Sequence, residues 1–207
     1  MRPLTYEVPK PLLEVHGKTL LQHQIDFLRN HAELIAVTIG YMPDKVSQHA
    51  LQFGVDYVFQ NNSGGNANWL NSSILRDYQA PIIIITCDNL MDVNLADIEK
   101  ESEASKELSF LVTRTEKSEL KGDRIAHSDG RITSITQNLG NYTLATGLQV
   151  LNPGTLTPKV NFDNFHQVWQ DLISQELLYV SRNQPEKWRA IDTVSDLRDA
   201  NRKMNAE

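Results

Sequence analysis

The sequence predicts an α/β domain built on a doubly wound, mostly parallel sheet, and three observations support this fold class. Strand and helix patterns alternate through the first half of the chain, which requires right-handed crossovers between parallel strands. The run from Ile82 to Cys87 is too apolar to have a solvated face, which is typical of a strand at the centre of a sheet covered by helices on both sides. The 207 residues are enough for one full-sized core, and no linker divides them.

The first half of the chain, residues 1–105, reads as repeating strand–helix units. Thr19 is a suitable N-cap, and the apolar residues Leu21, Ile25 and Leu28 that follow it fall on one face of a helix. Alternation and turn residues then predict, in order, a strand over 34–39, a helix from 43 to about 54, a strand over 55–59, a loop over 61–65 and a short helix over 68–76.

The second half, residues 106–207, is mixed. It contains predicted strands over 108–112, 143–151 and 188–191, and a hairpin over 122–137 that turns at Asp129-Gly130. The apolar spacing of 165–173 predicts a helix with a buried face, and Thr193 caps a final helix. We therefore predict a single domain over 1–207, in which both halves share one core.

Composition excludes several classes of function. The chain has 20 basic and 26 acidic residues, a net charge of −6, which argues against a nucleic-acid partner. Its one cysteine, Cys87, allows no intramolecular disulfide and no thiolate zinc cluster. Zinc-type histidine spacing, G-x-S-x-G, an intact P-loop and G-x-G-x-x-G are all missing from the sequence. No signal peptide or membrane-spanning run is evident, so we expect a cytoplasmic protein without a membrane partner.

Lys10 and Asp88 are the first candidates for chemistry. Lys10 stands between two prolines that hold the segment extended, and an ammonium on a rigid segment suits a phosphate. Asp88 follows the Ile82 strand, and open α/β sheets bind ligands beyond the carboxyl ends of their strands. A carboxylate together with substrate phosphates is a typical magnesium site. The alternatives are a solvated surface lysine and an ordinary turn or cap aspartate.

Two further segments carry residues that a fold alone does not require. In the loop over 62–68, Gly64 and Gly65 would allow a base or a phosphate to approach the backbone closely, although such a loop can also be merely mobile. Asp192 lies at a strand-to-helix junction and could complete a metal site with Asp88, or it could simply be a charge at a helix N-terminus.

In order along the chain, these pieces resemble the sugar-1-phosphate nucleotidyltransferases of the nucleotide-diphospho-sugar transferase superfamily. Thr86-Cys87-Asp88-Asn89 is similar to that family's G-D-N metal-binding turn. The remaining matching segments are Met1-Arg2-Pro3-Leu4-Thr5, Pro9-Lys10-Pro11-Leu12-Leu13, Gly17-Lys18-Thr19-Leu20-Leu21, the strand Thr146-Gly147-Leu148-Gln149-Val150-Leu151-Asn152-Pro153, and Ala190-Ile191-Asp192-Thr193 with Asp196-Leu197. Together they cover essentially the whole chain.

The resemblance implies a Rossmann-like three-layer sandwich and the transfer of a nucleoside monophosphate from an NTP to a sugar-1-phosphate or phospho-alcohol, with release of pyrophosphate. Carried over, Lys10 would contact phosphate, and Asp88 and Asp192 would hold Mg²⁺. Gly64 and Gly65 would lie against the base. Three more residues are expected to bind substrate: Asn66 in the glycine-containing loop, and Asn89 and Gly147 within the matching motifs.

The resemblance also bears on the substrates. CTP or UTP is the expected nucleotide, and the Ile-Asp-Thr form with the segment 68–73 is similar to the phosphocholine and capsular cytidylyltransferase branch, which favours CTP. Arg114, Lys121 and Arg124 are candidates for contact with the acceptor phosphate because of their charge and position. Whether the protein is a homo-oligomer stays open. The alternative function is a non-catalytic relative that binds a nucleotide or sugar nucleotide as a sensor or partner subunit.

The family's first strand and its G-x-G-[ST]-R phosphate loop have no counterpart in this sequence, which begins at the position after that arginine. The loop would wrap a triphosphate with backbone N–H groups, and the strand would lie in the middle of the sheet. We therefore expect the natural protein to extend further upstream, with Met1 an internal methionine, and an in-frame G-x-G-[ST]-R in the genomic sequence would show it.

Overall fold

A computed structural model describes residues 1–61, 65–72, 75, 78, 80–115, 122–136 and 143–202. The chain divides into two compact units, each assembled from segments that are far apart in the sequence. The first unit comprises Met1–Asn62, Cys87–Leu90 and Arg189–Glu207, and the second comprises Ser63–Thr86 and Met91–Trp188. The chain passes between the units at four points, and two of these lie within the strands β6 (Asn89–Met91) and β12 (Trp188–Ala190), which form a two-stranded sheet.

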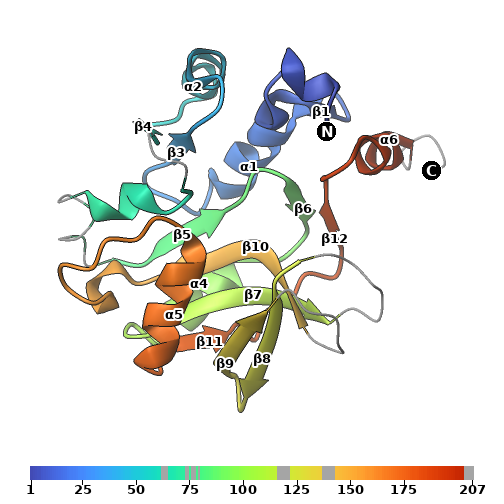
Figure 1. Cartoon of the computed structure of the whole chain (residues 1–207). Helices are drawn as coiled ribbons and strands as arrows, with labels where there is room; N and C mark the ends of the chain where they lie inside the picture. The colour runs from blue at the N-terminus through green and yellow to red at the C-terminus, as the bar shows by residue number, and fades with distance from the viewer. Residues whose placement is uncertain are drawn as a thin grey trace. The chain divides into compact units, whose positions relative to one another are not determined.

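The first unit begins with short elements and then forms helices around a parallel strand pair (Figure 1). Thr19 caps α1 as predicted, because its Oγ1 accepts a hydrogen bond from the Gln22 N–H at 3.0 Å. Its described elements are η1 (Leu4–Tyr6), η2 (Lys10–Leu12), β1 (Glu14–Val15), β2 (Lys18–Thr19), α1 (Leu20–Leu28), β3 (Ala36–Ile39), α2 (Pro43–Gln52), β4 (Tyr57–Gln60) and α6 (Val194–Arg202). Strands β3 and β4 run parallel, which confirms the strand–helix–strand unit expected over 34–59.

Two apolar clusters hold the first unit together. One joins α1, β3 and α2, and its fully buried members include Ile25 and Ala50. The other joins the N-terminal segment to the C-terminal one: Leu13, Val15 and Leu20 pack against Ile191 and the α6 residue Ala200. The chain ends of this unit are therefore fixed by hydrophobic burial, which brings the two candidate segments around Lys10 and Asp192 into the same unit.

The second unit is built on a six-stranded sheet with the order β5-β10-β7-β11-β9-β8. Its described elements are η3 (Asn68–Asn71), β5 (Ile82–Ile85), α4 (Leu95–Ala104), β7 (Ser109–Thr115), β8 (Arg124–Ser128), β9 (Arg131–Thr136), β10 (Thr143–Leu151), η4 (Pro153–Thr155), α5 (Phe165–Ser174) and β11 (Leu178–Val180). The hairpin β8–β9 turns at Asp129 and Gly130, whose φ angles are +52° and +83°, as the sequence predicts. Across these ranges and the first unit, none of the described helices has the length and apolarity to cross a membrane.

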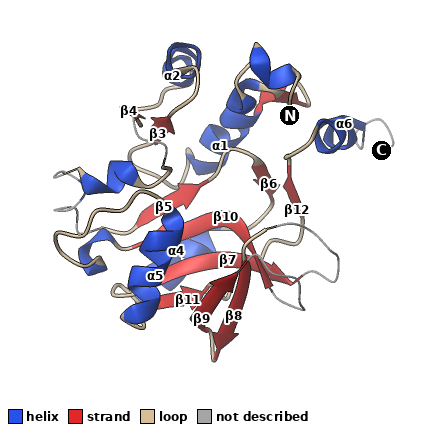
Figure 2. Ribbon diagram, in the orientation of Figure 1, coloured by secondary structure: helices blue, strands red, loops and turns tan. Residues whose placement is uncertain are grey.

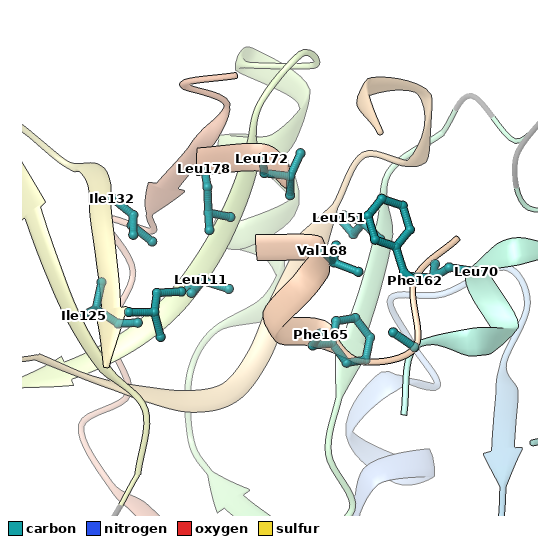
Figure 3. Packing of buried hydrophobic residues seen from close by; sticks show 12 residues of the cluster. Leu70, Leu111, Ile125, Ile132, Leu151, Phe162, Phe165, Val168, Leu172 and Leu178 are labelled. Atoms are coloured by element: carbon teal, nitrogen blue, oxygen red, sulfur yellow. The ribbon is translucent and has the colours of Figure 1, made fainter. Parts of the chain in front are cut away.

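Helices cover both faces of this sheet: α5 crosses in front of it and α4 lies behind it (Figure 2). On the α5 side, Val168 and Leu172 are fully buried against strand residues such as Leu111 and Leu178 (Figure 3). Neighbouring positions on a strand point to opposite faces, so Val112, which is also fully buried, belongs to the α4 side. The second unit is thus a three-layer α/β sandwich.

The α/β class is confirmed, but the sheet is mixed rather than mostly parallel. Among the strand pairings described for the six-stranded sheet, only β7–β11 is parallel, and β10 runs antiparallel to both of its main neighbours, β5 and β7. The prediction came from the strand–helix repeats of the first half, whereas most strands of this sheet come from the second half. A continuous apolar run indicates that both faces of its strand are covered, but it does not indicate the direction in which the neighbouring strands run.

Two smaller expectations also need correction. Strand β5 lies at the end of the six-stranded sheet in the described chain, and its four isoleucines are half-buried rather than central. In the segment 68–76, where a helix is expected, Asn68–Asn71 form the 3₁₀ helix η3 and Leu75 is α-helical, while residues 73–74 and 76–77 lie outside the described ranges. The two units do not coincide with the halves 1–105 and 106–207, because residues 63–86 and 91–105 belong to the second unit and residues 189–207 to the first. A division of labour between those halves stays a prediction.

Candidate functional site

Lys10 is held by the local backbone of the segment that precedes it. Pro9 is extended, with φ −62° and ψ 145°, and caps the 3₁₀ helix η2, in which the Leu12 and Leu13 N–H groups donate to the carbonyls of Pro9 and Lys10. The expectation of an extended segment is therefore wrong at Lys10 itself. Pro11 is tolerated in the first turn of a helix, where its missing N–H would have had no partner. Lys10 thus sits on a short, proline-braced turn.

The Lys10 ammonium group contacts two carboxylates that are far apart in the sequence. Its Nζ lies 2.6 Å from Asp88 Oδ2 and 2.9 Å from Asp192 Oδ1. About a quarter of the Lys10 and Asp88 side chains is exposed (26% and 27%), whereas 62% of the Asp192 side chain is exposed. All three residues belong to the first unit. The structure therefore brings together the three charged residues that the sequence singled out, in a cluster open to solvent on the Asp192 side.

Backbone pairing explains how Asp88 and Asp192 meet. The Ile191 N–H donates to the Asp88 carbonyl at 2.8 Å, so the residue before Asp192 is hydrogen-bonded directly to Asp88. Ile191 is fully buried in the cluster that joins the N- and C-terminal segments of the unit. Apolar packing thus fixes the register, and the two carboxylates follow from it.

Asp192 does not serve as the cap of α6. Thr193 does so, because its Oγ1 accepts from the Asp196 N–H at 3.1 Å. Asp196 in turn accepts from the Asp192 and Thr193 N–H groups at 3.1 and 2.7 Å. Burial raises the pKa of Asp196, but the hydrogen bonds from Thr193 and Asp192 outweigh it, so its pKa lies below the usual value. The Asp192 side chain is left for the ammonium of Lys10.

The two aspartates of the cluster favour the charged form of Lys10. Burial lowers the pKa of Lys10, yet hydrogen bonds and charge attraction from Asp88 and Asp192 exceed that effect, so the pKa of Lys10 is raised. The neighbouring thiol behaves differently: burial, assisted by the Asp88 charge, raises the pKa of Cys87 to about 12. At neutral pH Cys87 is therefore a protonated thiol and not a nucleophile.

The side chain of Asn89 turns toward Asp88. Asn89 is 9% exposed, and its side chain donates from Nδ2 to Asp88 Oδ1 at 3.0 Å. Its backbone carbonyl accepts a hydrogen bond from Gln24 Nε2 at 2.8 Å. Sequence reasoning missed Gln24. The available signal was an amide on the same helix face as Leu21, Ile25 and Leu28, where an apolar residue would be expected.

The paired carboxylates suit a divalent cation. Asp88 and Asp192 already hold one positive group between them at hydrogen-bond distance. Over the ranges that the structure describes, no group of three or more His, Cys, Asp or Glu side chains is arranged to hold a metal ion. A site with two carboxylates is what Mg²⁺ uses when phosphate oxygens and waters complete its octahedron. The residues present therefore fit Mg²⁺ bound together with a phosphorylated ligand.

The other residues expected to bind substrate belong to the second unit or lie outside the described ranges. Gly64 is outside them. Gly65 permits a close approach of the Asp163 backbone, since a Cβ at Gly65 would stand 1.8 Å from the Asp163 carbonyl oxygen. The Asn66 Oδ1 accepts from the Phe165 N–H at 3.1 Å. Gly147 has φ +85° and its carbonyl accepts from the Thr86 N–H at 3.0 Å.

These contacts show that three of the expected substrate-binding residues also help to hold the second unit together: Gly65, Asn66 and Gly147. Their contact with substrate stays a prediction. The same holds for the basic residues expected near the acceptor. Arg114 Nη1 donates to the Glu186 carbonyl at 2.8 Å, Arg124 is buried with 3% exposed, and Lys121 lies outside the described ranges.

Fold and cluster together define a class: an α/β protein in which two carboxylates that follow strands meet a lysine on a 3₁₀ turn, and in open α/β sheets the ends of strands are where ligands bind. The sequence matches the nucleotidyl transferase family over residues 1–207, and the chain belongs to that family. The resemblance drawn from the motifs is thereby confirmed.

Individual relatives are 25% to 28% identical to this chain within the aligned segments. A choline-phosphate cytidylyltransferase from Streptococcus pneumoniae is 27% identical over 46% of this chain and 42% of its own length. A UTP–glucose-1-phosphate uridylyltransferase from Haloferax volcanii is 28% identical over 66% of this chain and 59% of its own. A mannose-1-phosphate guanyltransferase from Pichia angusta is 25% identical over 95% of this chain and 58% of its own. This chain spans about half the length of these relatives.

Solved structures confirm the Rossmann-like nucleotide-diphospho-sugar transferase fold. The CTP:phosphocholine cytidylyltransferase from Streptococcus pneumoniae superimposes with a TM-score of 0.74 at 19% identity, covering 99% of this chain and 93% of that one. The inositol-1-phosphate CTP transferase from T. maritima gives a TM-score of 0.74 at 18% identity, covering 100% and 88%.

Proposed function

We propose that this protein is a Mg²⁺-dependent nucleotidyltransferase that transfers a nucleoside monophosphate from an NTP to a sugar-1-phosphate or phospho-alcohol and releases pyrophosphate. The observation that carries the proposal is the contact of the Lys10 ammonium with two carboxylates, those of Asp88 and Asp192, at 2.6 and 2.9 Å. Membership of the nucleotidyl transferase family supports the reaction class.

In this reaction an oxygen of the acceptor phosphate attacks the α-phosphorus of the NTP. A new P–O bond forms as the bond to the bridging α–β oxygen breaks, and the electron pair leaves with pyrophosphate. Little covalent chemistry falls to the protein, so the rate depends on positioning the two phosphates and neutralising their negative charge. Bound Mg²⁺ supplies charge neutralisation and orientation of the triphosphate.

The residues of the cluster divide this work. Asp88 and Asp192 would hold the metal, and the Lys10 ammonium would neutralise phosphate charge beside it. Asn89 fixes the orientation of the Asp88 carboxylate through the 3.0 Å hydrogen bond to Oδ1. The other oxygen, Oδ2, is directed at the Lys10 ammonium. Acceptor contacts are proposed for the mixed half of the chain, residues 106–207.

CTP is the nucleotide we propose, with UTP as the second choice. Relatives named for cytidylyl transfer occur among both the similar sequences and the similar structures. The Ile191-Asp192-Thr193 form of the closing motif supports the same branch. Uridylyl- and guanylyltransferases also occur among the relatives, so the base must be assigned by measurement.

The test is a pyrophosphate-release assay on the full-length protein with CTP, UTP, dTTP and GTP. Each is paired with phosphocholine, glucose-1-phosphate, mannose-1-phosphate and inositol-1-phosphate, with and without Mg²⁺. We expect Mg²⁺-dependent release that needs both an NTP and an acceptor and is greatest with CTP. Nucleotide binding without turnover in every combination would instead support a non-catalytic nucleotide-binding relative.

A further inference from the structure

A buried amide interrupts the apolar face of α1. Gln24 is only 6% exposed, and it lies among Leu20, Leu21 and Ile25, the other buried residues of that helix. Burying an amide without partners costs free energy that an apolar side chain of the same size would not. The Gln24 side chain must therefore find its compensation in a specific contact.

That contact is made with the turn that carries Asp88. Gln24 Nε2 donates to the Asn89 carbonyl at 2.8 Å, in a hydrogen bond between buried groups. The carbonyl one residue earlier, that of Asp88, accepts from the Ile191 N–H at 2.8 Å. Two consecutive peptide carbonyls are thus tied to two different elements, one to α1 and one to the segment after β12. The backbone at Asp88 and Asn89 is fixed from both sides.

The fixed backbone determines where the Asp88 carboxylate points. Asn89 follows it in the chain and donates from Nδ2 to Asp88 Oδ1 at 3.0 Å. The other oxygen, Oδ2, is directed at the Lys10 ammonium 2.6 Å away. Gln24 holds the Asn89 carbonyl, Asn89 holds one carboxylate oxygen, and the second oxygen is presented to a cation. The chain of contacts runs from a helix to a charged atom without a gap.

We propose that Gln24 is a positioning residue for this site, acting through Asn89 to set the direction in which Asp88 presents Oδ2 to a bound divalent cation. This proposal rests on the proposed function in one respect, namely that the site binds a divalent cation. Gln24 itself touches neither substrate nor metal. Partners one step removed from a metal ligand contribute roughly 10- to 100-fold to metal affinity or activity when they are removed.

A purely structural role for Gln24 makes a different prediction. If its amide served only to satisfy a buried carbonyl, an apolar replacement would lower the melting temperature and leave cation binding unchanged. If it positions Asp88, the same replacement weakens cation binding in protein that is still folded. Cation affinity and stability must therefore be measured on the same variants.

The experiment compares Gln24→Met, which keeps the length of the side chain and removes the donor, with Gln22→Met on the same helix. Gln22 is partly exposed, so this control repeats the chemical change away from Asp88. Mn²⁺ alone is titrated into each full-length protein and free Mn²⁺ is followed by electron paramagnetic resonance. We expect the Mn²⁺ dissociation constant to rise about tenfold for Gln24→Met and to stay at the wild-type value for Gln22→Met.

A second readout separates positioning from nucleotide binding. In the pyrophosphate-release assay, the Mg²⁺ concentration for half-maximal rate should rise for Gln24→Met, while the KM for nucleotide at saturating Mg²⁺ stays unchanged. Gln24→Leu, which also removes the donor, replaces Gln24→Met if the methionine variant does not fold. Wild-type Mn²⁺ affinity in the folded Gln24 variant, or equal losses at Gln22 and Gln24, would overturn the proposal. If Mn²⁺ binding depends on Asp88 and Gln24 but the wild-type protein shows no transferase activity, only the proposed function is overturned.

Discussion

Asp88 and Asp192 share a single ammonium group. The Lys10 Nζ donates to Asp88 Oδ2 at 2.6 Å and to Asp192 Oδ1 at 2.9 Å, and the two aspartates come from separate segments of the first unit, 87–90 and 189–207. Two carboxylates at this spacing would repel each other without a cation between them. In the protein as described, Lys10 provides that positive charge.

Replacing Asp88 with alanine should abolish Mg²⁺-dependent turnover. The change removes one of the two carboxylates proposed to hold the metal, and we expect kcat to fall by about 10² to 10³ or more, the loss typical of a deleted electrostatic contact in an active site. Asp26→Ala is the matched control, because Asp26 forms an exposed ion pair with Lys18 at 2.7 Å. Circular dichroism should show both variants folded. Unchanged turnover in Asp88→Ala would remove Asp88 from the site.

Replacing Lys10 with methionine should strengthen the binding of Mn²⁺ alone while weakening catalysis. The ammonium occupies the same two carboxylates that would bind the metal, so the free protein must give up these contacts when the metal enters. A partly exposed ion pair is worth about 0.2 to 1 kcal/mol, which corresponds to about 1.4- to fivefold tighter Mn²⁺ binding. At the same time kcat/KM should fall, because phosphate charge loses a neutralising group.

Lys18→Met is the control for this change, since the Lys18 ion pair with Asp26 lies on an exposed surface of the same unit. It should leave both Mn²⁺ affinity and kcat/KM unaltered. If Lys10→Met bound Mn²⁺ no better than wild type, the ammonium and the metal would not be competing for the same oxygens. An unaltered kcat/KM would make Lys10 a surface lysine without a role in phosphate handling.

The sequence predicted the charged cluster better than it predicted the six-stranded sheet of the second unit. Three charged residues were identifiable because each stands next to a strongly patterned segment: Lys10, Asp88 and Asp192. Such a segment fixes the position of the residue beside it in the fold. The antiparallel course of β10 was not identifiable, because an apolar strand looks the same whichever way its neighbour runs. Gln24 was missed because its role depends on a carbonyl in a distant turn, a contact that no local pattern encodes.

Acidification should destabilise the protein through His49. The His49 Nε2 lies 2.8 Å from Oγ1 of Thr19, the N-cap of α1, and burial lowers the pKa of His49 despite the opposing charge of Glu14. With a folded-state pKa below the ordinary value of 6.5, the unfolded chain binds the proton more readily. The stability that neutral His49 contributes is therefore present above about pH 6.5 and is lost as the pH falls through that value toward the folded-state pKa.

Urea denaturation at pH 7.5 and at pH 5.5 measures this effect. The midpoint should fall between the two pH values in the wild type, and the fall should be smaller in His49→Gln. His166→Gln, at an exposed position of α5, should retain the wild-type dependence. Identical pH dependence in wild type and His49→Gln would show that other groups cause the acid sensitivity.

Replacing Gly65 with alanine should destabilise the second unit. A Cβ at this position would lie 1.8 Å from the Asp163 carbonyl oxygen, a backbone atom that cannot move aside as a side chain could. The Asp163 carbonyl also accepts from the Ala67 N–H at 3.0 Å, so a shift to relieve the clash would break that hydrogen bond as well. Overpacking of this kind typically costs about 1 to 3 kcal/mol, or a melting temperature lower by several degrees in a chain of this size.

Gly40→Ala is the matched control, because a Cβ at Gly40 meets nothing within 4 Å and the residue does not have a positive φ. Its melting temperature should equal that of the wild type in differential scanning calorimetry. The pair of variants also tests the expected contact between Gly65 and the base. If Gly65→Ala melts like the wild type but has a raised KM for the nucleotide, the glycine is required by the ligand and not by the Asp163 backbone. A lower melting temperature with an unchanged KM assigns it to the scaffold.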